Sequence, residues 1–223
     1  MSDITITGVT VFKVRLPVVS ERRQGSGITK DAVTNIFVKL DTDAGIVGWG
    51  EAATSATFPG GTEAHMAALH IYFRPLVMGA DPFRIEQIME QAERTVVHAA
   101  EAKAGLEMAL FDIVGKALGT PVCNLLGGPY RDEIPLSFSI ANPDLGADVE
   151  MAKRLYDDGL RIFKVKTGAA GHGEDLRRLE TLRTELASDV DLRVDYNQAL
   201  DVFDAIPKLR DVEAFRPTFI EQP

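Results

Sequence analysis

The stretch Phe163-Lys164-Val165-Lys166-Thr167 alternates hydrophobic and polar side chains, and this pattern predicts a β-strand. Because successive side chains of a strand point to opposite faces, Lys164 and Lys166 share one face. Two ammonium groups side by side repel each other, and burial adds the cost of removing them from water. Taken alone, such a pair is commonest as two exposed lysines on an edge strand. Matching partners on neighbouring strands would instead indicate a site that uses lysine chemistry.

Two further predicted strands end in such partners. Asp195 and Asn197 share a face at the end of one strand, and Glu221 lies at the end of the next. Lys166 precedes Asp195 by 29 residues, and Asp195 precedes Glu221 by 26, which is about one strand–helix unit each. The ends of parallel strands converge on one rim of an α/β domain, where active sites are built. We therefore expect two lysines and two carboxylates around one cavity.

The sequence pattern changes near residue 130. The first block predicts strands and then helices, which favours an α+β domain. Its predicted strands are 4–16, as a strand pair or one long bent strand, 33–40 and 46–51. Its predicted helices run from 62 to about 72 or 77, from 81 to 97 and from 99 to 118. Residues 17–29 are polar and predict a mobile loop.

After the Gly127-Gly128-Pro129 turn, strands alternate with helices. The predicted strands are 134–140, 161–167, 190–197 and 218–222, and the predicted helices are 148–157, 174–186 and one that begins near residue 201 or 204. This alternation indicates a parallel sheet in a barrel or a doubly wound fold. Four strands of a barrel leave an open edge, so we expect that the remainder lies outside these 223 residues.

The residue types themselves suggest a chemistry. Two inward carboxylates on adjacent strands repel each other unless a cation lies between them, and oxygen ligands suit Mg²⁺ or Mn²⁺. A lysine beside another lysine and a divalent cation should have a lowered pKa and could act as a general base. A cation and a lysine base together suit removal of a proton next to a carboxylate.

Composition narrows the class of protein. The chain has a net charge of −9 and lacks a basic stripe, which argues against a nucleic-acid partner. No apolar run reaches the length of a membrane span, and the first residues lack a signal-peptide pattern, so we expect a cytoplasmic protein without a membrane partner. Cys123 is the only cysteine, which excludes an internal disulfide.

The motifs at residues 163–168, 194–198 and 220–223 resemble those of the enolase superfamily, in its muconate lactonizing enzyme / mandelate racemase branch. Residues 45–52 and 104–112 are similar to that family's N-terminal capping domain. The resemblance implies a capping domain over residues 1–130. It also implies that residues 131–223 are the first four strands of a TIM-like (β/α)₇β barrel, truncated midway, with Mg²⁺ at the ends of three successive strands.

When the family's residue roles are carried over by position, the resemblance implies that Asp195 and Glu221 are metal ligands and that Lys166 is the general acid/base. Lys164 would bind the substrate carboxylate and help to lower the pKa of Lys166, and Asn197 would lie near metal and substrate. Two loops, residues 18–28 and 53–61, would form a lid that selects the substrate. The third metal ligand and the opposite acid/base would lie beyond residue 223.

The function implied is a Mg²⁺-dependent isomerase that removes the proton α to a carboxylate through an enediolate, with a small carboxylate substrate and a homo-oligomeric state. A muconate-type cycloisomerase is favoured over a racemase or epimerase of an amino-acid derivative or dipeptide, and over a dehydratase of an acid sugar or hydroxy acid. Two other classes stay open. They are an inactive fragment, and a metal-free barrel with a Schiff-base lysine.

Overall fold

The computed structural model describes residues 4–54 and 61–223. The chain divides into two compact units, Met1–Pro17 with Ala32–Asp132, and Val18–Asp31 with Glu133–Pro223. The second unit thus includes a short segment that the sequence-based division had left in the first block. Each unit has its own hydrophobic core and is described by itself.

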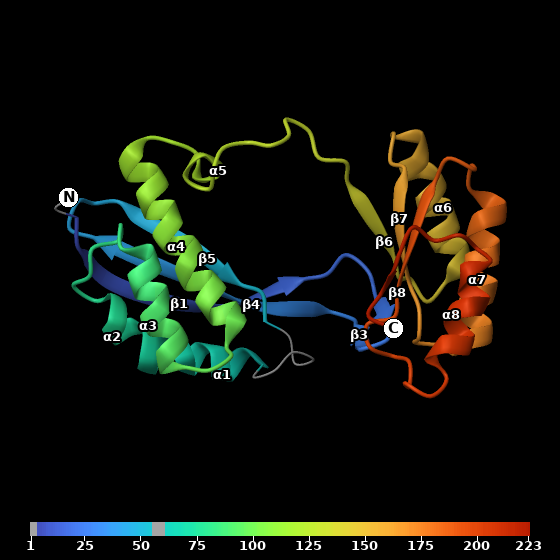
Figure 1. Ribbon diagram of the computed structural model, residues 1–223, viewed down its shortest axis with the longest axis horizontal. Coiled ribbons are helices and arrows are strands. Elements are labelled where there is room, and N and C mark those ends of the chain that lie inside the picture. Colours follow the sequence, from blue (N-terminus) through green and yellow to red (C-terminus); the bar gives the residue numbers. More distant parts are fainter. Residues whose placement is uncertain (1–3, 55–60) are drawn as a thin grey trace. The chain divides into compact units, whose positions relative to one another are not determined.

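The first unit is an antiparallel sheet covered by helices (Figure 1). Its strands are β1 (Ile6–Pro17), β4 (Ala32–Thr42) and β5 (Val47–Ala52), in the order β1-β4-β5. Its helices are α1 (Gly61–Ala67), the π-helical turn η1 (Ala68–Phe73), α2 (Arg74–Val77), α3 (Ile85–Thr95), α4 (Ala100–Leu118) and α5 (Val122–Leu125). The predicted α+β character is confirmed.

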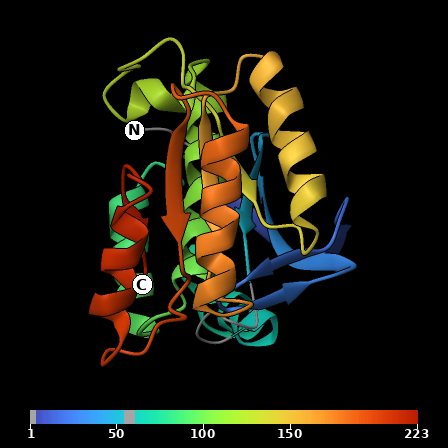
Figure 2. The same ribbon diagram turned by 90° about the vertical axis from the view of Figure 1, so that its right-hand side faces the viewer.

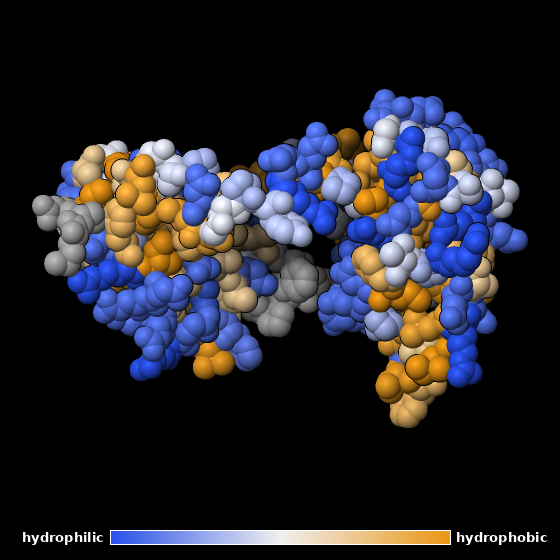
Figure 3. Space-filling model, turned by 45° about the horizontal axis from the view of Figure 1, so that its top comes forward, coloured by the Kyte–Doolittle hydropathy of each residue, from blue (hydrophilic) through white to orange (hydrophobic). Residues whose placement is uncertain are grey.

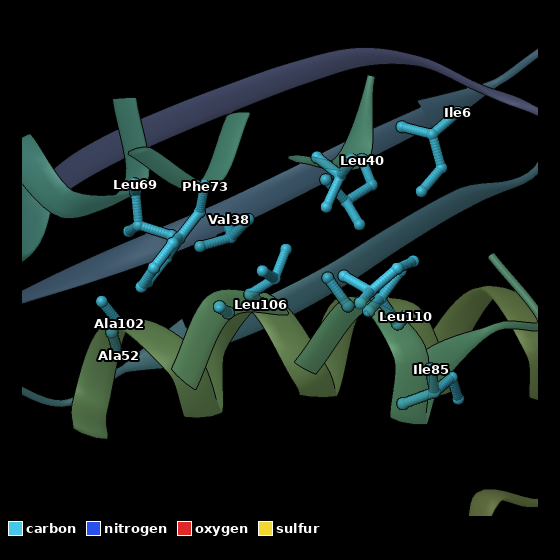
Figure 4. Close-up of a cluster of buried hydrophobic side chains, with 14 of the residues drawn as sticks. Ile6, Val38, Leu40, Ala52, Leu69, Phe73, Ile85, Ala102, Leu106 and Leu110 are labelled. Atoms are coloured by element: carbon cyan, nitrogen blue, oxygen red, sulfur yellow. The ribbon is translucent and has the colours of Figure 1, made fainter. Parts of the chain in front are cut away.

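Alternation along β4 builds the core of this unit, because Val38 and Leu40 point to the helix side and are fully buried. Figure 4 shows Leu106 and Leu110 of α4 facing them.

The predicted start of the second helix at Asp81 is wrong. The Asp81 carboxylate accepts a hydrogen bond from the Phe83 amide at 2.9 Å and forms a turn, so α3 begins only at Ile85.

The second unit contains a parallel sheet in sequence order. Its strands are β6 (Ser137–Ile140), β7 (Ile162–Lys166), β8 (Asp191–Asp195) and β9 (Ile220–Glu221), and its helices are α6 (Leu145–Asp157), α7 (His172–Glu185) and α8 (Ala205–Glu213). Each helix connects one strand to the next strand in the sheet. Because such connections are right-handed and all lead in the same direction, the three helices cover the same face. Figure 2 shows them as a row in yellow, orange and red. This arrangement is that of a partial α/β barrel rather than a doubly wound sheet.

The helix-covered face of this sheet is hydrophobic, and the opposite face carries the polar side chains. Phe163 and Val165 of β7 are fully buried against the helices, while Lys164 and Lys166 alternate with them on the other face. β7 is paired on both sides, with β6 and β8. The two lysines therefore do not lie on an exposed edge strand.

Residues 17–29 are not the irregular loop that their polarity predicted. They contain a hairpin of β2 (Arg22–Gln24) and β3 (Gly27–Thr29). The hairpin is tied to the end of β6, because the Arg23 amide donates to the Ala141 carbonyl at 2.8 Å and the Arg22 guanidinium donates to the Ser139 carbonyl at 2.7 Å.

Hydrophobic side chains also interrupt the polar surface, as Figure 3 shows. In the second unit, Val202, Phe203 and Ile206 are more than half exposed. They lie before and within α8, next in sequence to the edge strand β9.

Across residues 4–54 and 61–223, no helix is both long enough and apolar enough to cross a membrane.

The packing of α4 on β5 can be tested at Gly50. A β-carbon at this position would lie 1.9 Å from the carbonyl oxygen of Gly105, so the helix must move to accommodate it. Gly50→Ala should lower the free energy of unfolding by at least about 2 kcal/mol in urea denaturation. Gly173→Ala is the control, because a β-carbon in this helical position meets nothing within 4 Å. Equal stability of the two variants would contradict this account of the contact.

Candidate active site

The candidate site lies at the ends of three neighbouring strands. In the register of the sheet, Lys166 of β7 is paired with Asp195 of β8, and Asp195 is paired with Glu221 of β9. Parallel strands that end level with one another place their last side chains in one row. The spacing seen in the sequence is therefore realised as a row of lysine, aspartate and glutamate.

The two lysines converge on a single carboxylate oxygen. The Lys166 ammonium lies 2.6 Å from Asp195 Oδ2, and the Lys164 ammonium lies 2.9 Å from the same atom. Lys164 also donates to Glu221 Oε2 at 2.8 Å, and Lys166 donates to Asn197 Oδ1 at 2.8 Å. The structure therefore brings together all five residues that the sequence singled out.

A local turn orients Asp195. Its second oxygen, Oδ1, accepts a hydrogen bond from the backbone amide of Asn197 at 2.9 Å. Asn197 and Gln198 both have positive φ angles, which tightens the chain just after β8. One oxygen of Asp195 is thus held by the backbone, and the other is presented to the lysines.

Burial and charge act in opposite directions on this cluster. Burial raises the pKa of Asp195, whose side chain is only 1% exposed, but the hydrogen bonds from Lys166 and Lys164 outweigh that effect and leave the pKa below its ordinary value. Burial lowers the pKa of Lys164, but its hydrogen bonds to Glu221 and Asp195 outweigh this and raise the pKa above its ordinary value. Asp195 is therefore held as a carboxylate, and Lys164 as an ammonium group.

A cavity of about 230 Å³ opens beside Lys166. Its lining comes from the hairpin, from the loops after β6 and β7, and from α7, namely Arg23, Ala141, Asn142, Pro143, Lys166, Ala169, Ala170, Glu174, Asp175 and Arg178. Arg23 lies in the predicted lid loop 18–28, and Asp175 and Arg178 lie on the predicted helix 174–186, but none of the three was singled out from the sequence. The three-residue spacing of Asp175 and Arg178, which places them on one side of α7, was the only signal. Of the other predicted lid loop, residues 55–60 lie outside the described residues.

The carboxylates suit a hard divalent cation in donor type and in position. Asp195 and Glu221 supply oxygens from adjacent strands, and the Lys164 ammonium already lies between them as a positive charge. Two carboxylates are few for such a cation. The described parts of the chain contain no group of three His, Cys, Asp or Glu side chains that could hold a metal ion. The two carboxylates therefore fit part of the ligand set of such a cation.

An antiparallel sheet with helices, followed by a partial α/β barrel with lysines and carboxylates at its strand ends, is an architecture of the enolase kind. Residues 6–127 match the family described as mandelate racemase / muconate lactonizing enzyme, N-terminal domain, and residues 147–223 match the enolase C-terminal domain-like family. The chain belongs to the mandelate racemase / muconate lactonizing enzyme family of the enolase superfamily, which confirms the resemblance seen in its motifs.

Individual relatives differ in the reaction that they are named for. The chain is 33% identical to an N-succinyl-L-Arg/Lys racemase of Bacillus cereus over 98% of its length. A muconate cycloisomerase from Azorhizobium caulinodans is 45% identical over the whole chain, with a TM-score of 0.78. A Pseudomonas fluorescens muconate lactonizing enzyme complexed with muconolactone is 30% identical over 98% of the chain, with a TM-score of 0.93. The chain spans 59%, 58% and 60% of these three proteins.

The burial of Asp175 predicts a pH dependence of stability. The residue is 4% exposed, and burial raises the pKa of its carboxyl group above 3.8, although a hydrogen bond from the Gly168 backbone amide opposes this. A carboxylate with a raised folded-state pKa costs stability as the pH rises from 3.8 through that folded-state pKa. Asp175→Asn should therefore gain stability relative to the unmodified protein across this window, as measured by urea denaturation from acidic to neutral pH. Surface Asp158→Asn controls for the change in charge, and a difference that does not vary with pH would contradict the assignment.

Proposed function

We propose that the protein carrying this chain is a Mg²⁺-dependent isomerase that removes the proton α to the carboxylate of a small substrate. The observation that carries this proposal is the placement of Lys166. Lys166 lines the cavity, and its amine lies 2.6 Å from Asp195 Oδ2, at the end of a strand. A base in this position can reach a substrate in the cavity while its own charge is balanced by the carboxylate beside it.

Asp195 and Glu221 would hold the Mg²⁺ through their carboxylate oxygens, together with further oxygen ligands. When bound, the ion supplies positive charge that stabilises the negative charge developing on the substrate carboxylate. The backbone amide of Asn197 fixes Asp195 Oδ1, so Asp195 is already oriented before the reaction begins.

The two lysines take different roles because their surroundings differ. Lys166 is 12% exposed and donates to Asn197, which aims its amine, and in its neutral form it accepts the α-proton. Lys164 is more exposed, at 25%, and remains an ammonium group that binds the substrate carboxylate.

A muconate-type cycloisomerisation is the favoured reaction, because two of the similar structures are named for muconate chemistry and one is 45% identical to this chain. Racemisation of an N-acylated amino acid is the second candidate, since the Bacillus cereus relative is named as a racemase. Both reactions need a base on one face of the α-carbon, and this is the role proposed for Lys166.

The proposed function predicts isotope exchange that depends on Lys166. In deuterated water with Mg²⁺, the protein should exchange the α-proton of muconolactone or of an N-succinyl amino acid, and Lys166→Ala should slow this by at least about 100-fold because it removes the base. Lys153→Ala is the matched control, since Lys153 is a half-exposed lysine of α6. NMR of the recovered substrate measures the exchange.

Calorimetric Mg²⁺ titration accompanies this test. Lys166→Ala should retain Mg²⁺ binding, because the lysine is not one of the proposed ligands. Exchange that survives in Lys166→Ala would eliminate Lys166 as the base. Absence of exchange with either compound in the unmodified protein would reject both proposed reactions.

A further inference from the structure

Two buried charged residues, one turn apart on α7, each hold a loop that borders the cavity. Asp175 accepts a hydrogen bond from the Gly168 amide at 3.0 Å, two residues after Lys166. Arg178 donates to the Asn142 carbonyl at 2.9 Å, two residues after β6 ends. The helix thus reaches the loops on both sides of the cavity.

Two side chains bind the backbone of Asn142, Arg178 at its carbonyl and Asp148 at its amide. The second arm of the Arg178 guanidinium donates to Asp148 Oδ2 at 2.8 Å, and the same oxygen accepts the Asn142 amide at 2.9 Å. Arg178 and Asp148 are 8% and 5% exposed. Since a buried ion pair is often no more stabilising than hydrophobic residues of similar size, stability alone does not account for it. What the pair provides is a fixed position for both backbone groups of Asn142.

The residue before Asn142 is one of the points at which the hairpin docks. The Ala141 carbonyl accepts the Arg23 amide at 2.8 Å, and this bond lies outside the ladder of β2 and β3. The hairpin turn also meets the loop after β8, where a β-carbon on Gly25 would lie 2.0 Å from the Tyr196 carbonyl oxygen. The hairpin therefore rests on the loops after β6 and after β8, at the same end of the sheet as Lys166.

We propose that Arg178 is a positioning residue that sets the docking of the β2–β3 hairpin beside the Lys166 cavity. By fixing Asn142, it fixes the neighbouring Ala141 carbonyl on which the hairpin docks. The docking does not depend on the reaction. Only its expected effect on catalysis rests on the proposed function.

The same helix supplies a matched control. Arg183 of α7 donates to three backbone carbonyls, those of Val190, Phe215 and Arg216, which precede β8 and β9. It therefore holds loops at the opposite ends of the strands. A general loss of stability from breaking an arginine–carbonyl contact should occur in both variants, whereas release of the hairpin should occur only when Arg178 is changed.

The test is hydrogen–deuterium exchange of the full chain, with Arg178→Lys and Arg183→Lys compared. A lysine carries all its N–H donors on one nitrogen and cannot replace the two separate arms of the guanidinium. Arg178→Lys should speed exchange in peptides covering residues 18–31 by at least about tenfold, the change expected from losing one hydrogen bond to a charged group. Exchange in residues 162–166 should be unchanged, and Arg183→Lys should leave the hairpin protected.

If Arg178→Lys fails to fold, Asp148→Asn replaces it, because it weakens the same hold while keeping the side-chain size. Faster hairpin exchange in either variant, without a change in β7, supports the proposal. Unchanged hairpin exchange, or equal acceleration in Arg183→Lys, overturns it. Once exchange of a substrate α-proton is measurable, Arg178→Lys should raise KM more than it lowers kcat. A failure of the proposed reaction would leave the hydrogen-exchange result intact, so the two claims can be separated.

Discussion

The carboxylate of Asp195 lies between two lysine ammonium groups, and the whole candidate site depends on this arrangement of charge. One buried negative charge offsets two positive charges that would otherwise repel each other on the face of β7. Glu221 adds a second carboxylate on the far side of Lys164. Two ammonium groups and two carboxylates thus balance in formal charge, and the proposed base and the two proposed metal ligands lie within reach of one another.

The parallel sheet makes this arrangement possible. Strands that run in one direction and end level place side chains of distant sequence in one row, and helices on a single face leave the other face for polar groups. Phe163 and Val165 pack β7 against the helices, so the alternating Lys164 and Lys166 are held on the opposite face of the strand. The hydrophobic core on one face of β7 and the hydrogen-bonded polar cluster on the other thus both restrain the strand.

Alternation and spacing were enough to predict which lysines and carboxylates meet, because these signals follow directly from strand geometry. The resemblance to a family added the roles of Asn197 and the capping domain. The hairpin, Asp175 and Arg178 were not predicted, since their placement depends on hydrogen bonds to backbone groups far away in the sequence, and such bonds leave no periodic pattern. The start of α3 was misplaced for a similar reason, because Asp81 caps a turn rather than a helix.

The central claim is that Asp195 and Glu221 together form a divalent-cation site beside Lys166. The most direct test is a crystal structure of the protein with Mn²⁺, which replaces Mg²⁺ at oxygen sites and scatters X-rays anomalously. The account predicts an anomalous peak within about 2.0–2.4 Å of oxygens from both carboxylates, and a loss of the Lys164 contact with Asp195. A peak elsewhere in the protein, with both carboxylates still bonded to Lys164, would contradict it.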